Sequence, residues 1–143
     1  VDALESAHER GVIHRDLKPS NVICHLDQAM LIDLSIARPP GRGRAGVGTN
    51  AYMAPEQVRG GTLSEATDVW GLGALLYEAA TRQTPFGDDG VGRSATPPTA
   101  MRSLRRVPRR LGEVVDACLA FTPGDRPDLT AISRTLRDAM PIG

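Results

Sequence analysis

Lysine is almost absent from this chain of 143 residues, because its 17 basic side chains comprise 16 arginines and the single Lys18. A mechanism that needs two separate lysines is therefore excluded. Aromatic residues are also scarce at 3%, and the two cysteines, Cys24 and Cys118, form no C-x-x-C pair. We expect them to be two buried thiols in a reducing compartment.

Long hydrophobic runs and an excess of charge of one sign are missing as well. The longest apolar stretch, residues 69–80, is interrupted by Gly71, Gly73, Tyr77 and Glu78, whereas a membrane helix needs about 20 mostly apolar residues. The first residues have no basic start and no apolar core, so they do not read as a signal peptide. The net charge is zero, which gives no overall field to attract nucleic acid or a membrane. We expect a cytoplasmic protein with no membrane segment and no nucleic-acid partner.

Apolar periodicity predicts a mainly α-helical chain with a few short strands in its first quarter. A helix is expected to end near residue 10, a buried central helix to begin after an N-cap at Ser64, and two more helices to follow. Two strand-like runs, residues 21–25 and 29–34, flank a hairpin turn. Residues 38–50 and 84–100 are rich in proline and glycine and predict loops. Each of these last three helices is predicted from a stripe of apolar residues at helical spacing. The stripe of the central helix is Val69, Leu72, Leu75, Leu76 and Ala79; those of the next two are Leu111, Val114, Val115, Cys118 and Leu119, and Leu129, Ile132, Leu136 and Met140.

The strongest signal for function is the run from His14 to Asn21, which reads H-R-D-L-K-P-S-N. It matches the catalytic-loop pattern H-R-D-L-x-x-x-N at every fixed position. In such a loop the carboxylate of Asp16 can accept the proton of an attacking hydroxyl, while the amide oxygen of Asn21 holds a metal. The agreement in register makes a purely local structural role for Asp16 the weaker interpretation.

Four further motifs follow in order along the chain. Asp33-Leu34-Ser35 stands twelve residues after Asn21, at the place of a D-F-G element whose aspartate binds Mg²⁺. Ser35 replaces the glycine, so we expect a steric cost if the backbone there needs an unusual conformation. The other motifs are A-P-E at residues 54–56, D-V-W-G-L-G at 68–73 and G-D-R-P at 124–127.

Together these motifs resemble the C-terminal lobe of a serine/threonine protein kinase of the bacterial, eukaryotic-like type. The resemblance implies a partial kinase domain over residues 1–143, with a catalytic loop at 14–21, an activation segment at 33–56 and a helical remainder at 64–140. It implies transfer of the γ-phosphoryl group of ATP to a protein hydroxyl, with ATP and Mg²⁺ as cofactors and a protein as substrate.

The resemblance also implies roles for individual side chains. Asp16 would be the catalytic base, and Lys18 would contact the γ-phosphate. Asn21 and Asp33 would bind Mg²⁺, and Thr49 would lie beside the substrate hydroxyl. The implied supports are His14 and Arg15 in the catalytic loop, Asp68 as an acceptor for the backbone of that loop, and a buried ion pair between Glu56 and Arg126.

The features with which the family's N-terminal lobe holds the nucleotide are not found in these residues. Residues 41–46 match G-x-G-x-x-G, but they follow Asp33 and are not flanked by a strand and a helix, so they do not form a nucleotide loop. Lys18 is already assigned, and no second lysine can anchor the α- and β-phosphates. We expect the N-terminal lobe to be absent, and ATP binding and activity of these residues alone to be weak. The alternatives are a non-catalytic, kinase-like interaction module and a truncated product whose upstream sequence encodes the other lobe.

Two arginine-rich segments admit more than one interpretation. The loop between Ser35 and Thr49 contains no Ser, Thr or Tyr but carries Arg38, Arg42 and Arg44. A disordered, solvated loop is favoured over a docking surface for acidic substrates. Residues 93–110 hold six arginines and no acid, and a solvated amphipathic helix within them is favoured over a binding site for a partner or acidic lipid.

The face that meets the nucleotide and the other lobe in this family is expected to be bare. It includes Val22, Ile23 and Leu34. Contiguous exposed apolar surface promotes association. We therefore expect the chain to self-associate.

Overall fold

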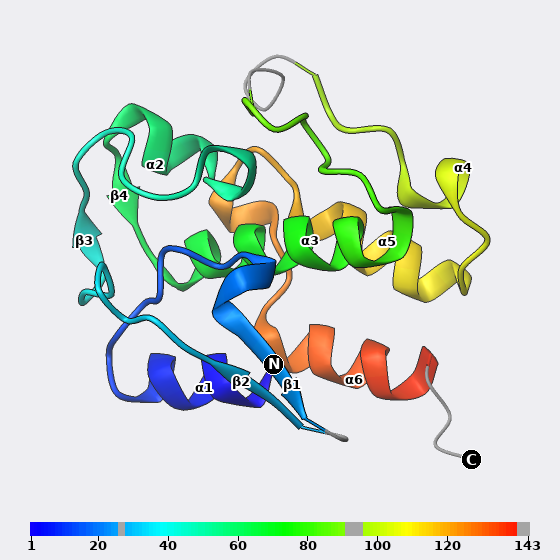
Figure 1. Ribbon diagram of the computed structural model, residues 1–143, viewed down its shortest axis with the longest axis horizontal. Helices are drawn as coiled ribbons and strands as arrows, with labels where there is room; N and C mark the ends of the chain where they lie inside the picture. The colour runs from blue at the N-terminus through cyan, green and yellow to red at the C-terminus, as the bar shows by residue number, and fades with distance from the viewer. Residues whose placement is uncertain (26–27, 91–95, 140–143) are drawn as a thin grey trace.

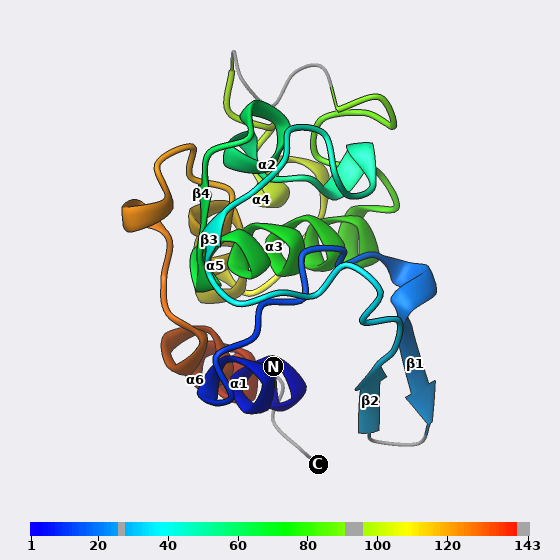
Figure 2. The ribbon, with the colours of Figure 1, turned by 90° about the vertical axis from the view of Figure 1, so that its left-hand side faces the viewer.

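The computed structural model describes residues 1–25, 28–90 and 96–139. At its centre lies α3 (Glu65–Thr81), with other helices arranged around it (Figures 1 and 2). α5 (Arg109–Cys118) packs against α3, while α1 (Asp2–Glu9) and α6 (Leu129–Ala139) lie side by side. The shorter helical segments are η1 (Pro19–Asn21), η2 (Asn50–Tyr52), α2 (Pro55–Arg59), α4 (Met101–Leu104) and η4 (Pro123–Asp125).

The central helix begins where the sequence predicts. Ser64 is extended, and its backbone N–H donates to Oγ1 of Thr67 at 3.1 Å, which satisfies a donor at the helix start. The glycines that interrupt its apolar run have packing roles. A Cβ at Gly73 would lie 2.5 Å from Cβ of Cys118, so only glycine allows α5 to approach this closely.

Two apolar clusters lie against α3 and form the core. The first joins α1, α3, α5 and α6 through Leu4, Leu17, Val69, Leu72, Cys118, Leu129 and Ile132. The second contains Ala54, Trp70, Ala74, Tyr77, Met101, Val115 and Leu119. The predicted stripes of α3 and α5 contribute to both clusters, that of α3 to the second only through Leu76, whereas the stripe of α6 contributes to the first alone. Met140 of that stripe lies outside the described residues. The mainly helical fold with short strands is therefore confirmed.

The predicted hairpin is present as β1 (Val22–His25) and β2 (Gln28–Leu31), paired antiparallel with Val22 opposite Leu31. Residues 26 and 27 of the predicted turn lie outside the described part of the chain. β2 ends earlier than predicted because the backbone turns at Asp33, whose φ is +63°. The hairpin projects away from the helices (Figure 2).

One face of this hairpin region carries exposed apolar side chains. Ile23 is 45% exposed and Leu34 61%, which confirms the expected bare surface, and Met30 extends it at 54%. Val22 is only partly exposed. The expectation of two buried thiols is wrong for Cys24, which is exposed on β1 because it lies in this projecting element, whereas Cys118 is buried.

The loop over residues 38–50 has a defined backbone, contrary to the disordered loop that its composition favoured. β3 (Gly41–Arg42) pairs antiparallel with β4 (Thr62–Leu63), and Ile13 bridges to Arg38. The backbone N–H of Gly46 also donates to the carbonyl of Gln57 at 3.0 Å. These pairings join segments far apart in sequence, which local composition does not reveal.

The basic segment before α5 is less helical than predicted. Only Met101–Leu104 forms a helix, with the N–H of Met101 bonded to Oδ1 of Asp116 at 3.0 Å. Arg105 is extended, and Pro108 follows shortly afterwards. Among the described helices, none is long and apolar enough to cross a membrane.

Candidate active site

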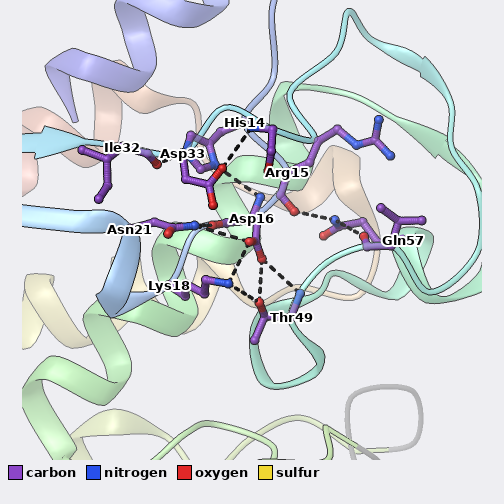
Figure 3. Close-up of polar contacts among 11 residues, drawn as sticks. His14, Arg15, Asp16, Lys18, Asn21, Ile32, Asp33, Thr49 and Gln57 are labelled. Carbon is purple, nitrogen blue, oxygen red and sulfur yellow. Dashed lines mark hydrogen bonds and ion pairs between the residues drawn. The ribbon is translucent and has the colours of Figure 1, made fainter.

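Asp16 stands at the centre of a polar network in the loop of residues 14–21 (Figure 3). Its Oδ1 accepts a hydrogen bond from the Thr49 hydroxyl at 2.7 Å and another from the Thr49 backbone N–H at 3.1 Å. Its Oδ2 lies 2.9 Å from Nζ of Lys18, which also donates to Oγ1 of Thr49 at 2.9 Å. The structure therefore brings together three residues that the motifs singled out from two separate segments.

The charge of Asp16 is stabilised by these donors. Partial burial opposes ionisation, but the hydrogen bonds from Thr49 and Lys18 and the positive charge of Lys18 outweigh it and lower the pKa of the carboxyl. The group is therefore a carboxylate at neutral pH, with both oxygens directed at hydrogen-bond donors.

Asn21 is fixed against the same loop. Its Nδ2 donates to the backbone carbonyl of Asp16 at 2.8 Å and approaches Oδ2 of Asp16 at 3.3 Å. Both bonds to Asp16 come from the amide nitrogen, so the amide oxygen of Asn21 is directed away from Asp16. That orientation suits an amide oxygen that ligates a hard cation.

Asp33 lies beside Asn21 because the N–H of the preceding Ile32 donates to the Asn21 carbonyl at 3.0 Å. The hydroxyl and the backbone N–H of Ser35 lower the pKa of Asp33, and the N–H bond is 3.1 Å long. The expected steric cost at Ser35 does not arise, because the positive φ falls on Asp33 instead. Serine at this position thus adds a hydroxyl donor to the aspartate.

The loop of residues 14–21 is anchored to the central helix through Asp68. Its two oxygens accept the backbone N–H groups of His14 and Arg15, each at 2.8 Å. A Cβ at Gly71, one turn further along α3, would lie 3.0 Å from Cβ of Leu17, so the helix and the loop touch closely. His14 is buried and contacts the Ile32 carbonyl through Nε2 at 3.2 Å.

The ion pair between Glu56 and Arg126 is buried and bidentate. Nη1 of Arg126 lies 2.7 Å from Oε1 of Glu56, and Nη2 lies 3.0 Å from Oε2. Thr67 donates to the same Oε1 at 3.0 Å, and the guanidinium stands 5.0 Å from the ring centroid of Trp70. The pair joins α2 to the segment before α6.

Two residues of this region were missed by sequence reasoning. Gln57 is buried, and its Nε2 donates to the carbonyls of Arg15 at 2.8 Å and Val47 at 3.3 Å. His8 places Nε2 2.8 Å from Oδ2 of Asp68. His8 lies on the same face of α1 as the buried Leu4, and this position in the sequence could have indicated that its side chain points inward. Gln57 belongs to no pattern in the sequence.

Residues 1–136 match the protein kinase domain family. The chain therefore belongs to the protein kinase family, which confirms the resemblance carried by the motifs.

Curated relatives of the chain are named as bacterial serine/threonine kinases. The chain is 41% identical over 152 residues to the serine/threonine-protein kinase PkaA of Streptomyces coelicolor, covering 96% of this chain and 27% of that protein. It is 39% identical over 136 residues to the probable serine/threonine-protein kinase PkwA of Thermomonospora curvata, covering 89% and 18%. The chain thus spans about a quarter or less of the length of these two relatives.

A solved structure confirms the fold. The kinase PK-1 of the Cydia pomonella granulovirus superposes with a TM-score of 0.78 at 21% identity. The match covers 94% of this chain and 53% of the viral one. The described elements therefore correspond to about half of that kinase chain.

Proposed function

We propose that this chain forms the C-terminal lobe of a serine/threonine protein kinase and carries the side of the active site that binds the substrate hydroxyl. The observation that carries the proposal is the bond from the Thr49 hydroxyl to Oδ1 of Asp16 at 2.7 Å. It places a hydroxyl oxygen within reach of an ionised carboxylate, which is the geometry that a general base needs.

In this proposal Asp16 accepts the proton of a serine or threonine hydroxyl as that oxygen attacks the γ-phosphorus of ATP. Lys18 holds Oδ2 of Asp16, and its ammonium would stabilise the negative charge that develops on the phosphoryl group. Thr49 positions the carboxylate from the other side. Positioning and charge stabilisation account for most of the catalysis in this reaction class.

The residues present fit a Mg²⁺ site formed by Asn21 and Asp33. Both offer oxygen atoms, the ligands that Mg²⁺ prefers, and Mg²⁺ is usually held by one or two carboxylates together with substrate phosphates and water. Within the described residues no group of three or more His, Cys, Asp or Glu could hold a metal without such help. When bound, the ion would neutralise charge on the phosphates of ATP.

Domain extent and location are part of the same proposal. The match to about half of a solved kinase chain supports the assignment of residues 14–21, 33–56 and the following helices to a C-terminal lobe. Both cysteines are free, which supports a reducing compartment such as the cytoplasm. No observation on the described residues favours a non-catalytic interaction module.

The test is transfer of labelled γ-phosphate from ATP to a serine- or threonine-containing peptide by the protein that carries this chain. Asp16→Asn keeps the shape but removes the base, so kcat should fall by about 10²–10⁴-fold. Asp138→Asn, at an exposed position on α6, is the matched control and should leave the rate unchanged. Wild-type rates in Asp16→Asn would overturn the proposal.

The 143 residues taken alone allow a second measurement. Their only lysine is already bonded to Asp16 and Thr49, so none remains to hold the α- and β-phosphates. We therefore expect weak ATP binding and little transfer from these residues by themselves, as measured by calorimetry and by the same transfer assay. Robust transfer that Asp16→Asn abolishes would contradict this expectation.

A further inference from the structure

The basic stretch, residues 102–110, joins α4 to α5 and contains five arginines but no acidic residue. All five are exposed, namely Arg102, Arg105, Arg106, Arg109 and Arg110. Figures 1 and 2 show α4 beside α5 and apart from the hairpin of β1 and β2. Because the chain as a whole is neutral, the basic stretch concentrates positive charge on one part of a surface that is balanced elsewhere.

Little of this charge is neutralised by the protein itself. Nε of Arg109 lies 2.6 Å from Oε1 of Glu113, and within the described part of the chain the other four arginines form no salt bridge. The hydrogen bond from Arg109 and the charges of Arg102 and Arg110 lower the pKa of the Glu113 carboxyl. Asp116, the next acidic side chain of α5, accepts a hydrogen bond from the first backbone N–H of α4 instead. Most of the positive charge of the basic stretch therefore remains available to a ligand.

An open hollow of about 250 Å³ lies within the basic stretch. Three arginines and three small or apolar residues line it, namely Arg102, Ser103, Leu104, Arg105, Arg106 and Val107. The stem of Arg102 packs over Gly112, where a Cβ would lie 2.4 Å from its Cγ. Guanidinium groups therefore surround a space that is large enough to admit a phosphate group.

We propose that the basic stretch binds the surface of a membrane that contains anionic phospholipids, with a headgroup phosphate in the hollow. Clusters of four to eight lysines or arginines are typical of such surfaces, and each cation strengthens binding by about fivefold. Leu104 is 44% exposed and lines the same hollow. Its apolar side chain can enter the boundary between headgroups and acyl chains, as in helices that lie on a membrane.

The composition of the basic stretch favours a lipid surface over an acidic protein as the partner. The core of a protein interface is depleted in charged residues and enriched in aromatic ones. Between residues 101 and 110 there is no aromatic residue, and Leu104 is the single large apolar side chain that is exposed. Arg105 is extended and interrupts the helix, so the arginines do not form one helical stripe. Because lipids diffuse within a bilayer, headgroup phosphates can adapt to this irregular spacing.

The test measures how much of the full chain floats with lipid vesicles on a density gradient, with no ATP present. Vesicles of phosphatidylcholine with about one-third phosphatidylglycerol should bind at least about tenfold more chain than phosphatidylcholine alone. Phosphatidylcholine alone also reports any binding by the exposed apolar face of the hairpin. Binding should weaken as salt rises from about 0.15 M to about 1 M, because the Debye length falls from about 8 Å to about 3 Å. Equal binding to both vesicles, or binding that salt does not weaken, would overturn the proposal.

Charge variants locate the binding surface. Arg105→Ala/Arg106→Ala removes two exposed charges and should reduce binding to the anionic vesicles by more than about tenfold. Arg134→Ala/Arg137→Ala removes the same charge from exposed positions on α6 and should leave binding close to wild type. Equal losses in these two variants would contradict a localised surface.

Two further arms separate a lipid surface from an acidic protein. Arg105→Lys/Arg106→Lys keeps the charge, so it should bind anionic vesicles within about twofold of wild type even if the alanine pair fails to fold. A large loss in the lysine pair would indicate recognition of planar guanidinium groups and would count against the proposal. Binding of a fluorescent polyglutamate peptide without flotation on anionic vesicles would also overturn it, in favour of an acidic protein partner. Because no phosphoryl transfer is measured, failure of these assays would leave the proposed kinase function untouched.

Discussion

The backbone N–H of Arg15 donates to Oδ1 of Asp68 at 2.8 Å, across 53 residues of sequence. This bond fixes the residue that immediately precedes Asp16. It acts together with the bond from His14 to the other oxygen of the same carboxylate. The orientation of the loop that carries Asp16 is therefore determined by a side chain of the central helix.

Replacing Asp68 should loosen this loop selectively. Asp68→Asn turns one acceptor oxygen into an amide donor that faces an N–H group, so about 1–3 kcal/mol of unfolding free energy should be lost. Hydrogen exchange at the His14 and Arg15 amides should accelerate, as measured by NMR. Asp138→Asn on α6 is the control, and protection of both amides equal to wild type in Asp68→Asn would contradict the proposed anchoring.

The hydroxyl of Thr49 should control the ionisation of Asp16. Thr49→Val removes the donor at 2.7 Å, so the pKa of Asp16 should rise toward its ordinary value of 3.8. A lowered folded-state pKa contributes stability that is present above the unfolded value and is lost as pH falls through the folded one. The stability difference between wild type and Thr49→Val should therefore shrink in acid. Carboxyl NMR titration and denaturation at several pH values measure both effects, and an unshifted Asp16 pKa would refute the prediction.

The buried pair between Glu56 and Arg126 should be costly to break from one side. Glu56→Ala leaves the Arg126 guanidinium buried without its partner, and we expect a loss of about 3–5 kcal/mol in unfolding free energy. The exposed pair Arg109–Glu113 on α5 is the internal control, since Glu113→Ala should cost only about 0.3–0.5 kcal/mol. Urea denaturation of the two variants compares them directly, and similar small losses in both would count against the buried pair.

The exposed apolar face near the hairpin should drive concentration-dependent self-association. Met30→Ser/Leu34→Ser removes the two most exposed large apolar side chains among the described residues, so it should shift the chain toward the monomer. Leu104→Ser changes a side chain that is 44% exposed on α4 and serves as the control. Sedimentation velocity reports the outcome, and a wild-type chain that remains monomeric throughout would remove the basis for the prediction.

The sequence predicted those parts of the fold and the site that depend on residues close together along the chain. Periodic apolar residues predicted α3, α5 and α6, and the spacing of Asp16 and Asn21 predicted their proximity because only a short loop joins them. Asp68 and the Glu56–Arg126 pair were assigned through resemblance alone, since their partners lie 53 to 70 residues away. The pairing of β3 with β4 and the role of Gln57 depend on such long-range contacts without any motif, so sequence reasoning could not find them.

The short pairing of β3 with β4 orders the loop of residues 38–50 while the chain folds, before any binding partner arrives. Fixing the backbone of one residue costs about 1–2 kcal/mol in conformational entropy. Because β3, the Ile13–Arg38 bridge and the bond from Gly46 to Gln57 already hold the loop, much of this cost is met as the chain folds. A protein segment that reaches Asp16 therefore meets a surface that is ordered before it arrives, and its affinity is not reduced by the entropy of ordering that surface.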